Sequence, residues 1–222
     1  LAGSNTSSEP TILKTTNGGT NWAAQSGVTG NLLSVYFSDA NTGYAVGEYG
    51  KIIKTSDGGT NWTVQSSGTT SNTLYSVFFT NVNTGYVASS GGIIFKTTDA
   101  GTTWSAQTIG SSQILKSVYF ANANIGYAVG YNGTIIKTSN GGTNWEVRTT
   151  GVTSTFYSVY FTDANTGYAV GFKTNPTSTS IKTINGGANW AMQPSALLTN
   201  YFFSVYFTDA NTGYAVGSNG TI

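Results

Sequence analysis

The stretch T-S-D-G-G-T-N-W at Thr55–Trp62 decides the fold, because it recurs along the chain at a nearly fixed interval. Each of the other four tryptophans ends a related octet, at Thr15–Trp22, Thr97–Trp104, Thr138–Trp145 and Thr183–Trp190. Successive tryptophans are 40 to 45 residues apart. A period of this length is the signature of a repeat protein in which every repeat is one structural unit.

A second segment recurs in step with the octet. It reads S-V-Y-F-S-D-A-N-T-G-Y-A-V-G at Ser34–Gly47, and its counterparts begin at Ser76, Ser117, Ser158 and Ser204. One period therefore contains four short runs rich in β-branched and aromatic residues, at Leu33–Phe37, Tyr44–Gly47, Lys51–Thr55 and Trp62–Gln65. Turn sequences rich in Asp, Asn and Gly separate the first run from the second and the third from the fourth. No apolar spacing of 3.6 residues persists beyond one turn, so we expect no helix.

Four antiparallel strands in a period of about 42 residues predict one blade of a β-propeller. A four-stranded sheet cannot bury both of its faces alone, so we expect the blades to pack face to face around an axis. Each indole brings on the order of 150–250 Å² of apolar surface to such a layer. The predicted structural core residues are therefore Trp22, Trp62, Trp104, Trp145 and Trp190, with sugar stacking as the alternative role for them.

The two ends of the chain predict how the propeller closes. Thr11–Lys14 and Trp22–Gln25 correspond to a third and a fourth strand, whereas Ser204–Phe207 and Tyr214–Gly217 correspond to a first and a second. We therefore expect residues 11–222 to form a single propeller of five four-stranded blades, in which the two ends share one blade. Such closure also removes exposed strand edges.

Residues 1–10 are left over in this scheme, and we expect them to form a tail or a segment that contacts another subunit. Within them, Leu1–Gly3 aligns with the A-V-G that ends a second strand. The alternative is therefore that the chain is a fragment of a longer propeller, for example a seven-bladed one.

Composition excludes several classes of function. Charged residues make up 8% of the chain, aromatic residues 14%, and the net charge is +1, which is the pattern of a folded protein rather than of a disordered one. The lysines and the single arginine are dispersed, whereas nucleic acid and membrane surfaces attract clustered cations. Cysteine and histidine are absent, so we expect no disulfide, no metal and no cofactor. The Thr-, Ser-, Asn- and Gly-rich composition favours a secreted bacterial protein at the cell surface.

The octet resembles the Asp-box, Ser/Thr-x-Asp-x-Gly-x-x-Trp, also called the bacterial neuraminidase (BNR) repeat. Asp57 and Asp99 occupy its acidic position in two copies, and asparagine does so in the others, at Asn17, Asn140 and Asn185. Together with Y-A-V-G and I-I-K-T, the pattern is similar to the propeller family that includes the photosystem II assembly and stability factor, and to repeat arrays of secreted bacterial surface proteins. This resemblance covers residues 11–222. It implies that Asp or Asn ties the turn between the third and fourth strands while Trp fills the core.

Sialidases carry the same boxes, so a sialidase-like glycosidase is one alternative. Such an enzyme needs an arginine cluster to hold the substrate carboxylate and paired catalytic carboxyl groups. The chain has one arginine, five of its eight acidic residues occupy repeat positions, and the other three are Glu9, Glu48 and Glu146. We therefore predict no catalytic residues and no enzymatic activity. A photosystem II assembly role, which the resemblance raises, would imply an arginine-rich docking patch that this sequence lacks.

The loops in which the repeats diverge are the predicted binding surface. The turns between second and third strands and the connections between blades would bring aromatic rings, amides and a few charges to one face, which suits a glycan or a protein ligand. The predicted binding residues are Glu48, Tyr49, Tyr131, Asn132, Phe172, Lys173 and Arg148, with Gln113, Lys116 and the apolar stretch Leu197–Phe203 beside them.

The sequence thus predicts a non-catalytic extracellular module for binding or adhesion, whose partner is a glycan or a protein. The alternative is a structural subunit of a surface layer, stalk or filament, in which residues 1–10 contact the next copy by β-augmentation. Neither hypothesis involves nucleic acid or insertion into a membrane.

Overall fold

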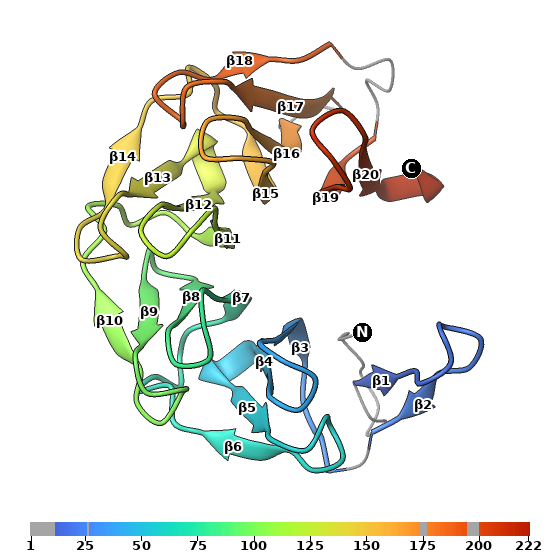
Figure 1. The fold of residues 1–222 in the computed structure, drawn as a ribbon. Helices are drawn as coiled ribbons and strands as arrows, with labels where there is room; N and C mark the ends of the chain where they lie inside the picture. Colours follow the sequence, from blue (N-terminus) through green and yellow to red (C-terminus); the bar gives the residue numbers. More distant parts are fainter. Residues whose placement is uncertain (1–11, 26, 174–176, 195–199) are drawn as a thin grey trace. The chain divides into compact units, whose positions relative to one another are not determined.

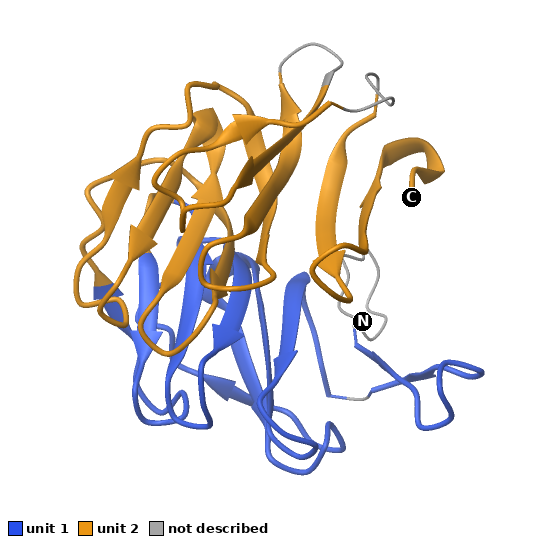
Figure 2. Cartoon of the chain, turned by 45° about the horizontal axis from the view of Figure 1, so that its top comes forward, with its two compact units in different colours: residues 1–90, 94–106 blue, residues 91–93, 107–222 orange. Residues whose placement is uncertain are grey.

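The computed structural model describes residues 12–25, 27–173, 177–194 and 200–222, and these residues form an all-β protein (Figure 1). They contain twenty strands and three 3₁₀ turns. The chain divides into two compact units, residues 1–90 with 94–106 and residues 91–93 with 107–222 (Figure 2). No helix in the described part of the chain is long and apolar enough to span a membrane.

The first unit contains a two-stranded sheet and two four-stranded sheets. In the small sheet, β1 (Leu13–Lys14) pairs with β2 (Ala23–Ala24). The next sheet has the order β3 (Leu32–Phe37), β4 (Gly43–Gly47), β5 (Ile52–Thr55) and β6 (Thr63–Gln65). The third has the order β7 (Leu74–Phe79), β8 (Gly85–Ser89), β9 (Ile94–Thr97) and β10 (Ser105–Gln107), the last residue of which falls in the second unit.

The second unit repeats this arrangement. One sheet has the order β11 (Leu115–Phe120), β12 (Gly126–Gly130), β13 (Ile135–Thr138) and β14 (Glu146–Arg148). The next has the order β15 (Thr155–Phe161), β16 (Gly167–Lys173), β17 (Thr177–Thr183) and β18 (Ala191–Met192). A last pair consists of β19 (Phe202–Phe207) and β20 (Gly213–Gly217). The 3₁₀ turns are η1 (Glu48–Gly50), η2 (Tyr131–Gly133) and η3 (Ser218–Gly220).

The predicted all-β class and the four antiparallel strands per repeat are confirmed. The strand limits predicted for the second period differ from those of β3 to β6 by one residue at most. One predicted loop was wrong. The sequence of residues 172–180 is typical of a long loop, but residues 172–173 and 177–180 belong to β16 and β17 and extend their hairpin, in which Phe172 pairs with Ser178 and Lys173 with Thr177. Thr177 and Thr179 favour extended backbone, and the ladder of the hairpin propagates into them.

The Asp-box closes its own turn, as the resemblance implied. In the box of the second sheet, the Thr55 hydroxyl donates to Asp57 Oδ1 at 2.8 Å, and the amide of Asn61 donates to the same oxygen at 2.9 Å. The asparagine box at Asn140 makes the same pair of bonds, from Thr138 Oγ1 at 3.0 Å and from the amide of Asn144 at 2.9 Å. An acceptor oxygen is therefore what the turn requires, and the negative charge is not.

This equivalence predicts an acid-sensitivity difference. Hydrogen bonds from Asn61 to Asp57, and from Thr103 to Asp99, lower the pKa of each carboxyl from 3.8 to about 2. Because the folded-state pKa is depressed, the stabilisation is present above the unfolded-state pKa and is lost as the pH falls from about 4 to about 2. We expect Asp57→Asn/Asp99→Asn to leave the melting temperature unchanged at pH 7 and to reduce its decrease between pH 4 and pH 2.

Thermal melts of both proteins at pH 7, 4 and 2 check this expectation. Asp39, Asp163 and Asp209 also have lowered pKa values, through hydrogen bonds from backbone amides two and three residues ahead, so both proteins keep some acid sensitivity. An equally steep decrease in the double variant would show that these two carboxyl groups do not contribute.

Four of the five tryptophans pack against the phenylalanine that ends the first strand of their own sheet. The ring centroids are 5.9 to 6.1 Å apart and the rings meet edge to face, in the pairs Phe37–Trp62, Phe79–Trp104, Phe120–Trp145 and Phe161–Trp190. Trp104 and Trp145 are buried, whereas Trp62 and Trp190 are half-buried. Trp190 also packs against a buried cluster that contains Tyr127 of β12, so it lies in the layer between two sheets.

Trp22 departs from the predicted core, because its side chain is 47% exposed. The described residues give the sheet of β1 and β2 no first strand, and hence no phenylalanine against which this indole could pack. The structure likewise describes β1–β2 and β19–β20 as two separate two-stranded sheets. The shared blade, and with it the count of five blades, is therefore not established by these residues, and residues 1–10 lie outside the described part.

Neighbouring sheets are joined by the lysine of I-I-K-T and the tyrosine of Y-A-V-G. In the first unit, Lys54 Nζ and the Tyr44 hydroxyl both donate to the carbonyl oxygen of Ala100 at 2.8 Å. In the second unit, Lys137 Nζ and the Tyr127 hydroxyl donate to the carbonyl oxygen of Gly186, at 2.6 and 2.9 Å. The acceptor is in both cases the fourth residue of the next Asp-box, so the recurring box also anchors the preceding sheet.

Candidate binding site

Each described first strand of a sheet, namely β3, β7, β11, β15 and β19, contains a β-bulge. The Cα register skips one residue there, which is Leu33, Tyr75, Lys116, Tyr157 or Phe203. The residue before the skip is a buried Leu or Phe, and the residue after it is always Ser. A bulge redirects the side chain of the extra residue. The repeat thus holds its core residues constant and varies the chemistry at the bulge.

In the second unit, three of these bulge residues lie together with three aromatic residues from neighbouring segments. We call this set the aromatic–lysine cluster, and it consists of Lys116, Tyr131, Tyr157, Phe172, Tyr201 and Phe203. The first strands β11, β15 and β19 supply one bulge residue each, η2 and β16 supply one ring each, and Tyr201 immediately precedes β19.

Four rings of the cluster are in continuous contact. Tyr157 stacks on Phe172 with centroids 5.6 Å apart and an interplanar angle of 18°, and it meets Phe203 edge to face at 5.6 Å. Phe172 in turn contacts Tyr201 at 4.3 Å. The side chains of Tyr201 and Phe203 are 37% and 46% exposed. An aromatic surface is therefore open to solvent at this end of the cluster.

The other end of the cluster carries a positive charge. Lys116 Nζ lies 5.2 Å from the ring centroid of Tyr131 and 5.8 Å from that of Tyr157, which are cation–π distances. Burial lowers the pKa of Lys116 to about 8, so most of this side chain is protonated at neutral pH. Beside it, Asn132 Nδ2 donates to Gln113 Oε1 at 2.9 Å. The cluster therefore offers aromatic surface and one cation, and the residue that follows Tyr131 in the chain adds an amide pair.

The structure brings together only part of the predicted binding set. Tyr131 and Phe172 belong to the cluster with Lys116 and Phe203, and Asn132 and its partner Gln113 lie next to it. Tyr157 was missed, although its repeat position, the same as that of Lys116, would have identified it. Phe172 and Lys173 are consecutive in β16, where side chains alternate between faces, so Lys173 is directed away from the cluster.

The remaining predicted residues lie elsewhere. Arg148, expected in a connection between blades, is the last residue of β14, where it pairs with Ile135 in the ladder and forms an ion pair with Glu146 at 2.6 Å. The prediction that Arg148 lies in a loop was therefore wrong, because its pairing with Ile135 extends β14 to this residue. Glu48 and Tyr49 lie in η1 of the first unit.

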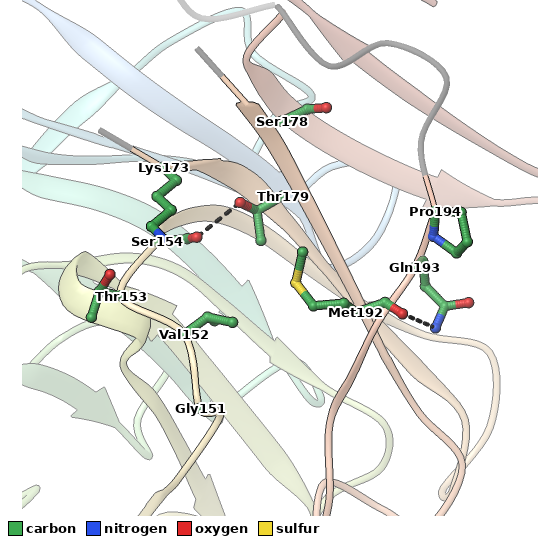
Figure 3. Close-up of a pocket in the computed structure, with 10 residues that line it drawn as sticks. All are labelled: Gly151, Val152, Thr153, Ser154, Lys173, Ser178, Thr179, Met192, Gln193 and Pro194. Atoms are coloured by element: carbon green, nitrogen blue, oxygen red, sulfur yellow. Dashed lines mark hydrogen bonds between the residues drawn. The ribbon is translucent and has the colours of Figure 1, made fainter. Parts of the chain in front are cut away.

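A separate cavity of about 870 Å³ lies in the second unit and contains Lys173 (Figure 3). Val152 and Met192 line it with apolar surface, and the buried hydroxyls of Ser154 and Thr179 hydrogen-bond each other at 2.8 Å. Because these hydroxyls bind each other, the cavity presents fewer polar groups to a ligand than its composition indicates. In the described part of the chain, no group of three acidic side chains is placed to hold a metal ion.

These features define a class: an antiparallel β-sheet repeat protein with Asp-box turns and a partly exposed aromatic surface. The family model described as photosynthesis system II assembly factor YCF48 matches residues 25–111 and 104–190. The chain belongs to this family, and the predicted family resemblance is confirmed. No curated protein matches the chain.

Solved structures with the same fold include two of YCF48. The one from Cyanidioschyzon merolae is 17% identical with a TM-score of 0.73, and the match covers 95% of this chain and 75% of that one. YCF48 bound to D1 peptide is 18% identical with a TM-score of 0.67, and the match covers 84% of this chain and 60% of that one. An ancestral GH74 enzyme is 18% identical with a TM-score of 0.72; this chain spans about a third of it, with 97% and 35% covered.

Proposed function

We propose that this chain is a non-catalytic propeller module that binds a segment of a partner protein through the aromatic–lysine cluster. The observation that carries the proposal is the recurring bulge. It brings three differing side chains, Lys116, Tyr157 and Phe203, into one cluster on neighbouring first strands while the residues around them stay constant. A position that varies on an invariant scaffold is where recognition is expected.

The chemistry of the cluster favours a protein ligand. Tyrosine and phenylalanine supply rigid contact area at low cost in side-chain entropy, and such residues dominate protein-binding surfaces. A large apolar or aromatic side chain fits against Phe203 and Tyr201, whose rings are partly exposed, and the ammonium of Lys116 favours a negative or carbonyl group beside it. Within the family, a YCF48 structure contains a bound D1 peptide, which supports peptide binding as a property that this fold can carry.

The state of the acidic residues supports a non-catalytic role. The five aspartates accept hydrogen bonds from backbone amides of their own turns, and Asp99 above all from the Thr103 hydroxyl, and these bonds lower the pKa values of the carboxyl groups. Glu48 accepts a hydrogen bond from Asn31, and Glu146 pairs with Arg148. Glycoside hydrolysis needs two carboxyl groups that flank one bond, and none of these residues offers such a pair. The sialidase-like alternative and an activity like that of the GH74 enzymes are therefore disfavoured.

The proposed setting is the extracellular surface of a bacterium, where the module would serve adhesion. The support is compositional: few charges and many Thr, Ser, Asn and Gly residues. Assembly into a layer or filament through residues 1–10 stays a prediction from the sequence.

We also propose that β19–β20 and β1–β2 form one shared blade and close a five-bladed ring. Lys14 of β1 donates to the carbonyl oxygen of Gly58 at 2.7 Å, the same contact that Lys54 and Lys137 make to the next Asp-box from complete sheets. In β20, Tyr214 is 54% exposed, whereas the equivalent Tyr127 is fully buried. If the ring closes, Tyr214→Ala will destabilise the protein as strongly as a truncation at a buried tyrosine.

The experiment that tests the binding function is selection of ligands from a phage-displayed library of random dodecapeptides. We expect enriched peptides to contain an aromatic or large aliphatic residue. Tyr157→Ala and Phe203→Ala should each weaken their binding at least about tenfold in calorimetric titrations, because truncation of an aromatic anchor typically costs more than about 1.4 kcal/mol. Val147→Ala, at an exposed position of β14 outside the cluster, is the matched control and should not change affinity. Failure to enrich any peptide, or unchanged affinity in both aromatic variants, would contradict the proposal.

A further inference from the structure

The turn between the second and third strands places its central residue in the left-handed region. This residue is Tyr49 in η1, with φ 57° and ψ 35°, and asparagine in the other two 3₁₀ turns, at Asn132 and Asn219 with φ 54° and 56°. The corresponding turn after β8 uses Gly91, with φ 76°. Glycine and asparagine adopt this conformation readily, whereas a tyrosine is strained in it.

Packing does not compensate for the strain at Tyr49. Its side chain is 78% exposed, so the ring gains little from burial. Asparagine at this position would give the same turn, as η2 and η3 demonstrate, at lower conformational cost. A residue that costs stability and adds no packing is a candidate for a functional residue.

The base of this turn is firmly held. Glu48 Oε2 accepts a hydrogen bond from Asn31 Nδ2 at 2.9 Å, and the amide of Glu48 donates to the carbonyl of Asn31 at 3.0 Å. The amide of Gly50 donates to the carbonyl of Asn72 at 2.7 Å, and Lys51 Nζ donates to the carbonyl of Thr29. Tyr49 therefore projects from a preorganised base, which lowers the entropic cost of binding.

A cavity of about 380 Å³ lies beside Tyr49, at the lower end of the usual range for ligand sites. Val64, whose side chain is 75% exposed, adds apolar surface to it. The other contributions are amide and hydroxyl groups and backbone, from Gly50, Gln65, Ser66, Ser67, Gly68, Thr69 and Thr70. The Ser67 hydroxyl donates to the carbonyl of Thr69 and the Thr69 hydroxyl to Asn72 Oδ1, so these two oxygens can act only as acceptors towards a ligand. No carboxylate is among the described residues that line the cavity, and its one cation, Lys51, donates to Thr29.

We infer that Tyr49 and this cavity form a site for a neutral carbohydrate, in which the tyrosine ring stacks on the apolar face of a sugar and the amide and hydroxyl groups bind its hydroxyls. Aromatic rings with a few polar groups around them suit a ligand that has an apolar face and a polar rim. A charged ligand is disfavoured, because the cavity offers no uncommitted charge. The site belongs to the first unit and is independent of the protein-binding function proposed for the second.

Calorimetric titration of the full chain with cellohexaose, mannohexaose and chitohexaose tests this inference. We expect at least one of these neutral oligosaccharides to bind. Tyr49→Phe should retain the affinity because it keeps the ring, whereas Tyr49→Asn should lower it at least about tenfold, as expected when an aromatic anchor is lost. Tyr49→Asn should at the same time raise the melting temperature by about 2–4 °C, since it relieves the strain.

Three outcomes would overturn the inference: no binding of any of the three sugars, unchanged affinity in Tyr49→Asn, or a lower melting temperature in that variant. If the selected dodecapeptides, rather than a sugar, lost affinity on Tyr49→Asn, the site would be a protein contact instead. Tyr157→Ala separates the two proposals, because it should weaken peptide binding at least about tenfold and leave sugar binding unchanged.

Discussion

Gly133→Ala is expected to destabilise the protein by about 3 kcal/mol or more, far beyond the usual cost of removing a glycine. Gly133 ends η2 with φ +68°, a conformation that costs an alanine about 1 kcal/mol. A Cβ at this position would also overlap the carbonyl oxygen of Val152 and lie 2.9 Å from Thr150 Oγ1. The overlap is with backbone, so the connection between β14 and β15 would have to move, and the hydrogen bond from the amide of Gly133 to the carbonyl of Ser154 would be distorted.

The chain contains a matched control for this prediction. Gly110, in the connection between β10 and β11, has φ +67°, and a Cβ built there meets no atom within 4 Å. Gly110→Ala should therefore show the conformational cost alone, about 1 kcal/mol. Urea unfolding of both variants, followed by tryptophan fluorescence, measures the difference in the free energy of unfolding. Equal losses in the two variants would show that close packing at Gly133 is not what requires glycine.

The repeat made most of the fold predictable. The octet and Y-A-V-G recur with little change, so the repeated sequence pattern alone predicted four strands per period and the Asp-box turn. Substitution of Asn140 for aspartate also indicated that the turn needs an acceptor and not a charge, which the hydrogen bonds from Thr138 and Asn144 bear out.

The site was less predictable, because it depends on register rather than on residue type. Nothing in L-K-S-V-Y-F states that Lys116 is the extra residue of a bulge, since a bulge is defined by the partner strand. The long insertion after Phe172 contains Thr, Ser, Asn and Pro, a composition typical of a loop. Nevertheless Lys173 pairs with Thr177 and Phe172 with Ser178, so these residues belong to a hairpin. Arg148 was assigned to a connection for the related reason that strand ends are the least certain part of a pattern.

The contacts that join sheets were also hidden from the sequence. The Lys of I-I-K-T and the Tyr of G-Y-A-V are about ten residues apart in the repeat, and their shared acceptor is a backbone carbonyl roughly 50 residues further on, as in Tyr44 and Lys54 with Ala100. Every residue has a backbone carbonyl, so the residue types do not indicate which carbonyl is the acceptor. The repetition of both residues was visible, and only the structure gives the reason for it.

Tyr127→Ala is expected to cost about 3–5 kcal/mol, the usual range for removal of a fully buried aromatic ring. The Tyr127 ring stacks on Phe161 with centroids 3.8 Å apart, and its hydroxyl donates to the carbonyl of Gly186. Tyr127→Phe should cost only about 1 kcal/mol, because the ring remains and Lys137 still donates to Gly186. Burial raises the pKa of Tyr127 to about 12, so its contribution is complete below pH 10 and is lost as the pH rises from 10 to 12. Tyr127→Phe should therefore also reduce the alkaline loss of stability.

Tyr214→Ala turns the same measurement into a test of ring closure. Phe37 of β3 is 42% exposed, whereas the equivalent Phe79 and Phe161 are buried and stack on Tyr44 and Tyr127 of the preceding sheet. Tyr214 is 54% exposed and occupies the repeat position of Tyr127. If the ring closes as proposed, both surfaces are covered in solution, and Tyr214→Ala will cost about as much as Tyr127→Ala in urea unfolding. A cost below about 1 kcal/mol, the usual effect at an exposed position, would mean that β19–β20 remains half a blade. Sedimentation of the unmodified protein at two concentrations distinguishes two ways of completing the blade. The strands β1–β2 and β19–β20 can pair within one molecule or between two molecules, and only pairing between two molecules depends on concentration.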